Sequence, residues 1–530
     1  MTTTLHIIPT VATDATVAET LDLASIVRVS ASDERAVAVA EMFRRDAAAW
    51  AARDLEGAGV ADEAAGDVRF ELRGEGGSGP LSPSSREALG EHEIAITPSG
   101  IRVSSDHEEG LSRGAASVVQ LLAGSETAIG ARVIRDGAAW GWRALSLDVV
   151  RFFSPVERVL QVIDLLALYK FSVLHLHLSD NEGWRLEIPG WPRLTPATAG
   201  TREYFTIEEY RRIVEYAARR FITVVPEIDL PGHAAAALRA YPELNPADAA
   251  NLGGPFPIAN LSPDSEAAWR LVDDVVRTLV ENTPGPFVHI GGDEAFGMDA
   301  AAHESFVEHA IAAVAAHSKS TVGWQETSRA AVGPDHTAQY WVDFDIDAPR
   351  DESAAGSKSG SDIPEDSMAA MVAHFAEAMG DRSRILEKGT HVVVSPISHA
   401  YLDRPHAEAS TDPAQEEQRS RVGLQYYPGT PVRDYLEWDP TTVLAGVDPS
   451  RIRGVEAAIW CESVTAASDI DALLLPRLPA VAEVAWAGSR RSDWEGFRSR
   501  IAHHALLWDA SGWEWFEVDS VDWRRSWVRG

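Results

Sequence analysis

The sequence has very little cysteine and no long apolar segment. Cys461 is the single cysteine in 530 residues, so an internal disulfide framework is excluded. No stretch approaches the roughly 18 uninterrupted apolar residues typical of a membrane span. The opening segment, MTTTLHIIPT, lacks the basic and apolar regions of a signal peptide. These absences favour a cytoplasmic protein.

Positive charge is also scarce. The chain has 47 Lys and Arg residues against 80 Asp and Glu residues, which gives a formal net charge of −33. Such an acidic surface repels nucleic acids and anionic membranes, so neither is expected as a partner. We interpret the excess acid as a solvated surface that keeps the protein soluble. Nothing in the sequence predicts the oligomeric state.

The first 138 residues predict a small α+β domain. Short β-like runs alternate with alanine-rich helical stretches, and no cluster of carboxylates, histidines and cysteines accompanies them. We therefore expect residues 1–138 to have a structural role. The expected strands cover 4–8, 27–29, 68–72, 93–97 and 101–104, and the expected helices cover 34–55 and 114–123.

From Trp140 onward the pattern changes to apolar runs, rich in β-branched residues, that alternate with amphipathic segments. Strands that alternate with helices imply a parallel sheet, and eight of them predict a (β/α)8 TIM barrel over residues 139–508. A carboxyl-terminal extension, 509–530, should pack on the barrel. The expected strands cover 144–150, 173–178, 222–228, 287–290, 321–324, 337–341, 392–395 and 455–460, and the last helix covers 471–484.

Two polar insertions interrupt the predicted barrel. The first covers residues 347–362, and the second, which is charged, covers 404–431 between the seventh and eighth strands. Loops of this kind lie either beside the mouth of a barrel or on its outside, and composition does not distinguish the two.

Nearly every predicted barrel strand ends in titratable or aromatic side chains. The carboxyl ends of barrel strands are where the active sites of this fold are built, and packing alone does not explain eight such ends in register. The residues are Asp148 and Arg151, His177 and Asp180, Glu227 and Asp229, Asp293 and Glu294, Trp324, Trp341, Tyr401 and Asp403, and Trp460 and Glu462.

The segment VHIGGDEAF, residues 288–296, places two adjacent acids after a glycine bend. Alone, Asp293 and Glu294 fit two interpretations, a helix start favoured by the helix dipole or a catalytic pair. Two-carboxylate glycosidases need acids on opposite faces of the sugar, whereas neighbouring side chains approach from one side. The pair therefore suits one acid that protonates the leaving oxygen and one that serves a group beside it.

The histidines offer a rival interpretation. His175 and His177 form an HxH strand end, which metal-dependent barrel hydrolases use together with further His and Asp ligands. Such a site would take His175, His177, His233, His289 and Asp293, but it leaves the tryptophans unexplained.

Tryptophan is abundant, with 17 residues. Trp324, Trp341, Trp438 and Trp460 fall at predicted strand ends or in loops. Aromatic faces stack on the apolar faces of sugar rings, so four tryptophans beside carboxylates predict a carbohydrate pocket. A carbohydrate-binding protein without catalysis is the alternative that this pocket leaves open.

Taken together, these segments resemble the β-N-acetylhexosaminidases of glycoside hydrolase family 20. The amino-terminal segment more loosely resembles the small, zincin-like α+β domain that precedes the barrel in that family. The matching segments, in family order, are WRALSLDVVRFF (142–153), HLHLSDNEGWRLEI (175–188), YFTIEEYRRIVEYAARRFITVVPEIDLPGH (204–233), NLSPDSE (260–266), VHIGGDEAF, VGWQE (322–326), QYW (339–341), VVSPISHAYLD (393–403), WDP (438–440), GVEAAIWCES (454–463) and PRLPAVAEVAW (476–486).

The resemblance implies a retaining, exo-acting enzyme that releases terminal β-linked N-acetylglucosamine or N-acetylgalactosamine. In this family the substrate's own acetamido oxygen is the nucleophile, and an oxazolinium intermediate forms. Glu294 would be the general acid and then the base. Asp293 would hold the acetamido N–H and stabilise the positive charge, and Tyr401 would donate to the acetamido oxygen.

The remaining roles are also implied by the resemblance. No cofactor and no metal are expected, and the partner is a glycan or amino-sugar substrate. Asp180 and His233 would lie behind Glu294 and tune it. The residues expected to contact the sugar are Trp324, Trp341 and Trp460 around the acetamido group, Arg143, Asp403 and Glu462 on the hydroxyls, and Trp438.

Overall fold

The structure is a computed structural model that describes residues 5–62, 67–74, 90–125, 127–196, 202–252, 257–343 and 365–524. The predicted first insertion, 347–362, lies outside the described residues. No helix in the described part of the chain is both long enough and apolar enough to cross a bilayer.

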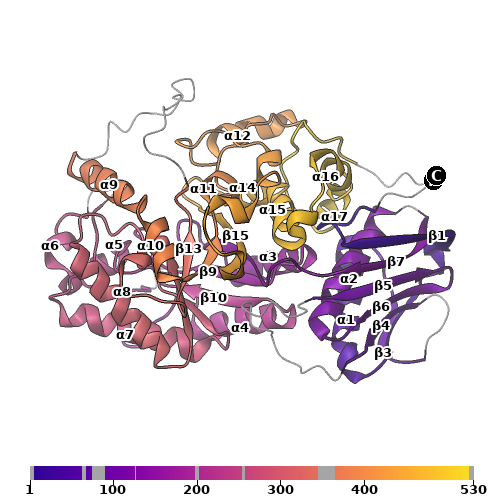
Figure 1. Cartoon of the computed structure of the whole chain (residues 1–530), viewed down its shortest axis with the longest axis horizontal. Coiled ribbons are helices and arrows are strands. Elements are labelled where there is room, and N and C mark those ends of the chain that lie inside the picture. Colours follow the sequence, from indigo (N-terminus) through magenta and orange to yellow (C-terminus); the bar gives the residue numbers. More distant parts are fainter. Residues whose placement is uncertain are drawn as a thin grey trace.

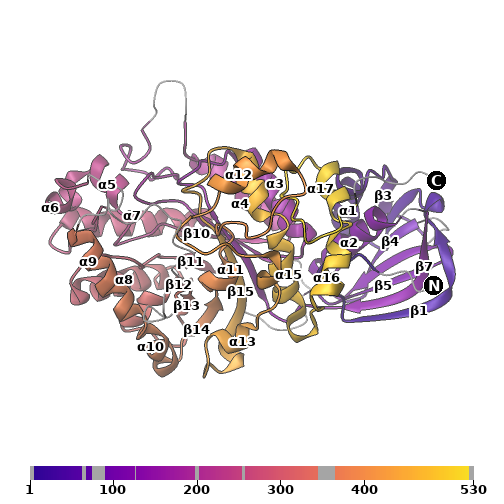
Figure 2. The same ribbon diagram turned by 90° about the horizontal axis from the view of Figure 1, so that it is seen from above.

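The amino-terminal part forms one seven-stranded sheet with two helices on one face (Figure 1). The strand order is β1-β7-β5-β6-β4-β2-β3. Seen from above, the helices lie between this sheet and the rest of the molecule (Figure 2). The elements are β1 (Thr13–Asp22), β2 (Arg28–Ala31), α1 (Glu34–Ala51), β3 (Glu56–Val60), β4 (Asp67–Leu72), β5 (His92–Thr97), β6 (Gly100–Ser105), α2 (Glu108–Gly124) and β7 (Ala128–Asp136).

The sequence pattern found both helices here but misplaced one strand and missed three. The expected strand at 4–8 is wrong, because residues 5–8 belong to no strand. Ile8 is instead fixed by the side chain of Gln120, which accepts from the Ile8 N–H and donates to the Ile8 carbonyl, both at 2.8 Å. The missed strands are β1, β3 and β7; β1 lies at the sheet edge and is mostly exposed, so it lacks a clear apolar alternation.

Eight parallel strands close into the predicted barrel, which confirms the fold class. Each strand hydrogen-bonds to the next, and β8 pairs with both β9 and β15 to close the ring. The strands are β8 (Trp142–Asp148), β9 (Val173–His177), β10 (Thr223–Glu227), β11 (Phe287–His289), β12 (Ser320–Trp324), β13 (Thr337–Tyr340), β14 (His391–Val394) and β15 (Ile452–Ile459).

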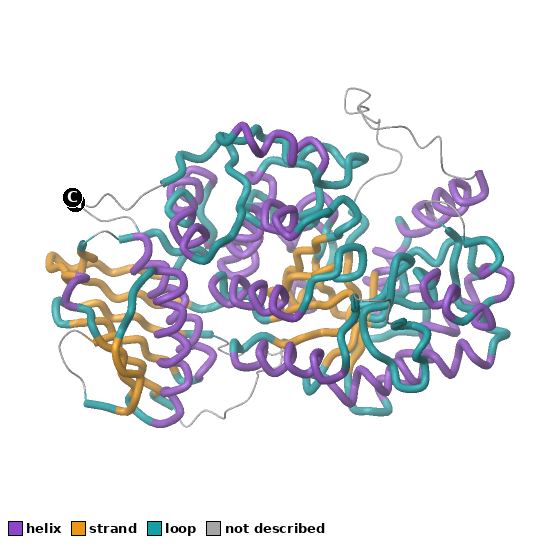
Figure 3. Tube along the Cα trace, turned by 180° about the vertical axis from the view of Figure 1, so that it is seen from behind, coloured by secondary structure: helices purple, strands orange, loops and turns teal. Residues whose placement is uncertain are grey.

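Helices surround the barrel strands, as Figure 3 shows from behind. The expected helix at 471–484 is broken, because Pro476 interrupts it after Leu475 and gives two helices. The helices are α3 (Val156–Leu168), α4 (Ile207–Arg219), α5 (Ala235–Ala240), α6 (Pro246–Ala249), α7 (Glu266–Asn282), α8 (Ala300–Ala315), α9 (Glu365–Ala378), α10 (Asp381–Lys388), α11 (Ile397–Ala400), α12 (Glu416–Arg421), α13 (Pro440–Val443), α14 (Ala467–Leu474), α15 (Arg477–Ala487), α16 (Trp494–Ile501) and α17 (Ala505–Ala510).

The barrel interior is apolar at the amino ends of the strands and becomes polar toward their carboxyl ends. Trp142 on β8 contacts Phe287 on β11 at 5.3 Å, and these strands are not neighbours in the barrel, so both rings point inward. Small and branched side chains from the other strands complete this apolar layer. The Trp142 indole N–H donates to Glu456 at 2.9 Å, which begins a polar layer.

A buried ion pair joins the sheet to the floor of the barrel. Lys170 follows α3, and its Nζ lies 2.8 Å from Asp136 Oδ2 at the end of β7. Both side chains are fully buried, and the Trp486 indole N–H also donates to Asp136 at 3.0 Å. A buried charge is stable only when it is paired in this way, so the two parts share one buried electrostatic contact.

The second insertion packs against the carboxyl-terminal segment. The Thr411 hydroxyl donates to Glu517 at 2.7 Å, and His406 stacks on Phe516 with ring centroids 3.9 Å apart. The chain after α17 therefore covers the loop that follows β14.

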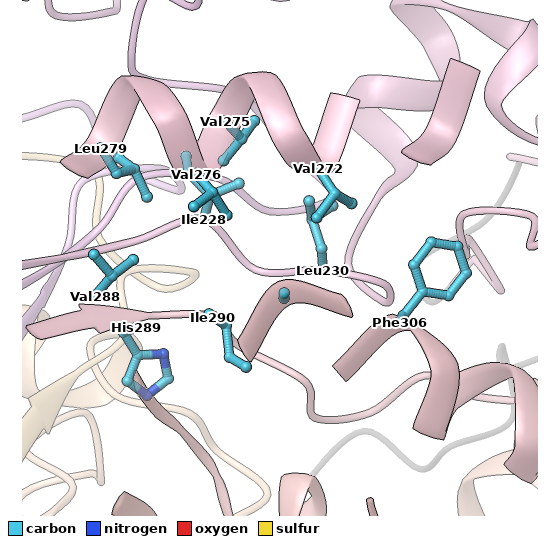
Figure 4. A pocket seen from close by; sticks show the side chains of 11 residues that line it. Ile228, Leu230, Val272, Val275, Val276, Leu279, Val288, His289, Ile290 and Phe306 are labelled. Carbon is cyan, nitrogen blue, oxygen red and sulfur yellow. The ribbon is translucent and has the colours of Figure 1, made fainter. Parts of the chain in front are cut away.

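A small apolar space separates β11 from α7 (Figure 4). Aliphatic side chains and Phe306 line it, and its only polar lining residue, His289, turns its ring away from α7. Because no carboxylate lines this space, it belongs to the packing of helix on barrel and not to the chemistry.

Candidate active site

The carboxyl ends of the barrel strands lie on one rim, because all eight strands are parallel in a closed ring. Asp148 ends β8, His177 ends β9, Glu227 ends β10 and Trp324 ends β12. The other strand-end residues follow β11, β13 and β15 within five positions, whereas Tyr401 and Asp403 lie seven and nine residues after β14.

The turn after β11 depends on glycine. Gly291 and Gly292 have φ of +65° and +97°. A Cβ on Gly291 would lie 1.8 Å from Asp229 Oδ1, and one on Gly292 would lie 2.6 Å from Thr327 Cγ2. Glu294 has a φ of +42°, a left-handed conformation that costs an L-residue roughly 1–2 kcal/mol. Such strain is typical of functional sites.

His233 lies among the acids of this turn. Its Nδ1 lies 2.9 Å from Asp180 Oδ1, and its Nε2 lies 3.5 Å from Glu294 Oε2 and 3.8 Å from Asp293 Oδ2. Burial lowers the pKa of His233, but the carboxylates of Asp180 and Asp229 outweigh it and hold that pKa well above its ordinary value. The structure thus brings Asp180 and His233 directly behind Glu294.

Asp293 is a mostly buried acid with few partners. Its side chain is 13% exposed, and Oδ1 has no hydrogen-bond partner among the described residues. Burial, followed by the facing Asp229 and Glu326 carboxyls, raises its pKa well above the usual range. Burial also raises the pKa of Asp229 to about 6. A ligand N–H would supply the partner that Asp293 Oδ1 lacks.

Three tryptophans and one tyrosine form an aromatic cluster beside these acids. The Trp324 ring centroid lies 6.4 Å from that of Trp341 and 5.8 Å from that of Trp460. Tyr401 lies parallel to Trp341, within 8°, at 6.4 Å. The Trp341 indole N–H donates to Glu326 at 3.1 Å, and this hydrogen bond fixes the orientation of the ring. These four rings can enclose a small apolar group.

Asp403 and Glu462 form the acidic side of the rim. Asp403 is fully buried and makes no side-chain hydrogen bond in the part of the chain that the structure describes. Burial and the nearby Glu462 raise its pKa well above the usual range. Burial raises the pKa of Glu462 to about 7, although Arg151 opposes the shift. The two Asp403 oxygens are therefore free to accept hydrogen bonds from a ligand.

The arginine of this site is Arg151, and the prediction of Arg143 is wrong. Arg143 is the second residue of β8 and therefore lies at the opposite end of the barrel. Its guanidinium is buried there and donates to the carbonyls of Lys170 at 2.8 Å and Trp140 at 2.6 Å. A strand this long separates its two ends, so a residue at its start does not reach the rim.

Arg151 was visible in the sequence as a strand-end residue but was not assigned a role. Its Nη2 lies 2.7 Å from Asp180 Oδ2 and 3.9 Å from Glu462 Oε1. Its guanidinium also lies 5.6 Å from the Trp460 ring centroid. Arg151 therefore connects Glu462, on the acidic side of the rim, with Asp180, which lies behind Glu294.

Trp438 lies outside the aromatic cluster. It stacks on His399 with ring centroids 5.5 Å apart, and its indole N–H donates to the Tyr435 carbonyl at 3.1 Å. It packs with the main hydrophobic core, so the structure does not bring it together with Trp324, Trp341 and Trp460.

The second insertion and the helix α9, which follows the first insertion, contribute side chains near the site that the sequence pattern missed. Tyr427, from the second insertion, packs against the aromatic cluster, and burial and Asp403 raise its pKa. Phe375 and His374 lie on α9, after the first insertion. Phe375 contacts Trp341 at 6.0 Å, and His374 Nε2 lies 3.1 Å from Glu326 Oε1. Loop composition gave no signal for these contacts.

The histidines proposed as metal ligands do not converge on one point. In the described chain, His175 and His289 group with Glu227, whereas His233 groups with Asp293 and Glu294. His177 belongs to neither group and bonds Glu227 and Asp180 instead. The HxH strand end therefore belongs to a buried hydrogen-bond network, and a metal-dependent hydrolase is not favoured.

A closed (β/α)8 barrel whose rim joins two adjacent acids, an aromatic cluster and further unpaired carboxylates defines a glycoside-cleaving enzyme. The chain belongs to glycosyl hydrolase family 20. Residues 140–489 match the model of the family's catalytic domain, and residues 4–137 match the model of its domain 2.

Relatives and solved structures agree with this assignment. A β-N-acetylhexosaminidase of Cellulomonas fimi is 37% identical over 399 residues, covering 74% of this chain and 72% of the relative. A β-hexosaminidase of Akkermansia muciniphila is 28% identical over 438 residues, covering 78% and 82%. The structure of Streptomyces plicatus N-acetyl-β-hexosaminidase in complex with Thio-NAglucal matches with a TM-score of 0.79 and 29% identity, covering 98% of each chain. This protein is therefore a glycoside hydrolase with β-hexosaminidase activity on a sugar substrate.

Proposed function

We propose that the protein is a retaining, exo-acting β-N-acetylhexosaminidase that works by substrate-assisted catalysis. The observation that carries this proposal is the pairing of Glu294 with Asp293, a buried acid whose Oδ1 lacks a donor, beside the aromatic cluster. One acid serves the leaving oxygen and the other serves a group on the same side of the sugar. A nucleophile supplied by the substrate itself fits this arrangement.

The catalytic roles follow from these positions. Glu294 protonates the leaving oxygen and then removes a proton from the attacking water. Asp293 accepts the acetamido N–H and stabilises the cyclic cation, and Tyr401 donates to the acetamido oxygen. Trp324, Trp341 and Trp460 enclose the acetamido methyl group.

The exo preference follows from the acidic side of the rim. Asp403 and Glu462 accept hydrogen bonds from the sugar hydroxyls, and Arg151 takes the place first predicted for Arg143. These groups bind the non-reducing end, so only a terminal residue has room. A related structure, a mutant of the Streptomyces plicatus enzyme, contains the product GlcNAc, which supports N-acetylglucosamine as a substrate unit.

Release of a chromophore from an aryl β-N-acetylglucosaminide between about pH 4 and pH 8 tests the activity. We expect turnover, with the β-anomer of the free sugar appearing first by NMR. Appearance of the α-anomer first would contradict retention. Glycan binding without turnover would instead support a carbohydrate-binding protein that lacks catalysis, an alternative that the intact set of acids disfavours.

A further inference from the structure

The buried network behind the rim connects the two halves of the proposed site, and this inference rests on the proposed function. One half is the acid side, where Glu294 is backed by His233 and Asp180. The other half is the acetamido side, where Trp324 forms part of the aromatic cluster. In the family roles described above, neither half includes the residue that lies between them, Glu227.

Glu227, the last residue of β10, is fully buried and uses its two oxygens in different directions. Its Oε1 accepts the Trp324 indole N–H at 2.8 Å. Its Oε2 lies 2.5 Å from His177 Nδ1, and the other nitrogen of that ring, Nε2, lies 2.9 Å from Asp180 Oδ2. Glu227 therefore contacts the acetamido wall on one side and the support of the acid on the other.

The contacts on the acid side form one continuous chain of hydrogen-bonding groups. Glu227 contacts His177, His177 contacts Asp180, and Asp180 contacts His233 at 2.9 Å. His233 ends the chain at 3.5 Å from Glu294. Carboxylates and imidazoles alternate along it. Both nitrogens of His177 are hydrogen-bonded to carboxylates, which fixes that ring, whereas His233 is hydrogen-bonded through Nδ1 and faces Glu294 through Nε2.

The charges around Glu227 keep it ionised. His175 and His177 on β9 and His289 on β11 all face it, with His175 Nε2 at 3.1 Å and His289 Nδ1 at 2.9 Å. Burial opposes ionisation, but these imidazoles hold the pKa of Glu227 well below its usual range. A buried polar network whose members are fully bonded is rigid, so Glu227 holds the partners on its two sides in a fixed arrangement.

We propose that Glu227 is a positioning residue that holds the Asp180–His233 support of the general acid and the Trp324 wall of the acetamido pocket in one fixed relation. It touches no substrate. Through His177 it fixes the support that positions Glu294, and through the indole N–H it fixes the position of Trp324. Protonation of the leaving group and binding of the acetamido group therefore both depend on this one carboxylate.

Two ratios of kcat/KM separate these effects. The acid ratio compares an aryl β-N-acetylglucosaminide with chitobiose, whose sugar leaving group needs protonation. The acyl ratio compares N-acetyl with N-butanoyl aryl glycosides and reports how closely the pocket fits. Glu227→Gln should change both, with a loss of about 10- to 100-fold on chitobiose relative to the aryl substrate and a clearly weaker preference for N-acetyl.

Two variants divide the contacts of Glu227. His177→Gln keeps an N–H directed at Asp180 but loses the one directed at Glu227, so it should change the acid ratio only. Trp324→Phe keeps the aromatic face but loses the N–H, so it should change the acyl ratio only. The double variant Glu227→Gln with His177→Gln should be no worse in the acid ratio than Glu227→Gln alone.

Asp136→Asn is the matched control. This carboxylate is as buried as Glu227 and also carries an ion pair, but it lies at the floor of the barrel. It should lower the melting temperature and leave both ratios at their wild-type values. A Glu227→Gln enzyme that behaves like this control, or that changes one ratio only, would overturn the proposal, as would fully additive losses in the double variant.

If Glu227→Gln does not fold, a change in both ratios by His177→Gln alone would contradict the separation of the two contacts. Wild-type enzyme that cleaves none of the substrates would contradict the proposed function instead.

Discussion

The two ends of the barrel treat buried charge in opposite ways. At the amino end, Arg143 donates to backbone carbonyls and its Nη2 lies 3.7 Å from Glu109 Oε1, and Lys170 is paired with Asp136. At the carboxyl end, Asp293 and Asp403 are buried with oxygens that lack side-chain donors, and burial raises the pKa of both. One end uses charge for stability, and the other keeps acceptors unsatisfied until a substrate supplies donors.

The largest effect should come from Glu294 at the carboxyl end. Glu294→Gln removes the proton donor, so kcat/KM on chitobiose should fall by about 10²- to 10⁴-fold. Aryl glycosides with activated leaving groups need less protonation and should lose less. Steady-state kinetics on both substrates checks this, and equal losses would contradict the assigned role of the acid.

Asp293→Asn should give the next largest effect. The amide cannot stabilise a developing positive charge, so turnover of every N-acetyl substrate should fall by about 10²- to 10³-fold, whatever the leaving group. Steady-state kinetics on chitobiose and the aryl glycoside measures this loss of turnover. Near-normal turnover would rule out stabilisation of the cyclic cation by Asp293.

The two arginines give a matched comparison between the ends. Arg151→Lys keeps the charge but loses the fork that contacts Asp180, so kcat/KM should fall about tenfold, or about 1.4 kcal/mol. Arg143→Lys leaves buried carbonyls without donors, so the melting temperature should fall while kcat/KM of the folded enzyme stays unchanged. Calorimetry and kinetics on both variants test the pair, and the reverse pattern would place the site at the wrong end.

The smallest effect should be a shift in pH dependence. Burial and the Asp229 carboxyl raise the pKa of Asp293, and activity requires Asp293 to be ionised, so activity is lost as the pH falls through that value. Asp229→Asn removes the neighbouring charge and lowers the pKa, so the acid limb of kcat/KM should move down by roughly one pH unit. An unmoved limb, or one moved upward, would show that another group controls it.

The sequence was sufficient for the barrel and for most of its rim. Periodic apolar runs located all eight strands, and the position of Trp324, Trp341 and Trp460 after those strands placed them beside the acids. The error at Arg143 has a simple cause. Arg143 precedes the predicted strand at 144–150, so a parallel barrel places it at the amino end, and its role was taken from the family resemblance alone.

Other parts of the site depend on contacts that no local pattern encodes. Glu227 was visible as a strand-end acid, but its two-sided bonding depends on which side chains of β9 and β12 face it. Tyr427 lies in the second insertion and Phe375 lies on α9, and both pack against the aromatic cluster through tertiary contacts. Trp438 lies in a loop where an aromatic residue was expected to contact the sugar, but it stacks on His399 and packs in the main hydrophobic core.

The Lys170–Asp136 pair has a consequence for how the molecule unfolds. The sheet supplies the only carboxylate that the structure places on this buried ammonium within its described residues. If the sheet detached, a bare cation would remain inside the floor of the barrel, at a cost of several kcal/mol. We therefore expect the barrel to depend on the sheet for its stability despite its closed architecture, and heating should melt both parts in a single cooperative transition.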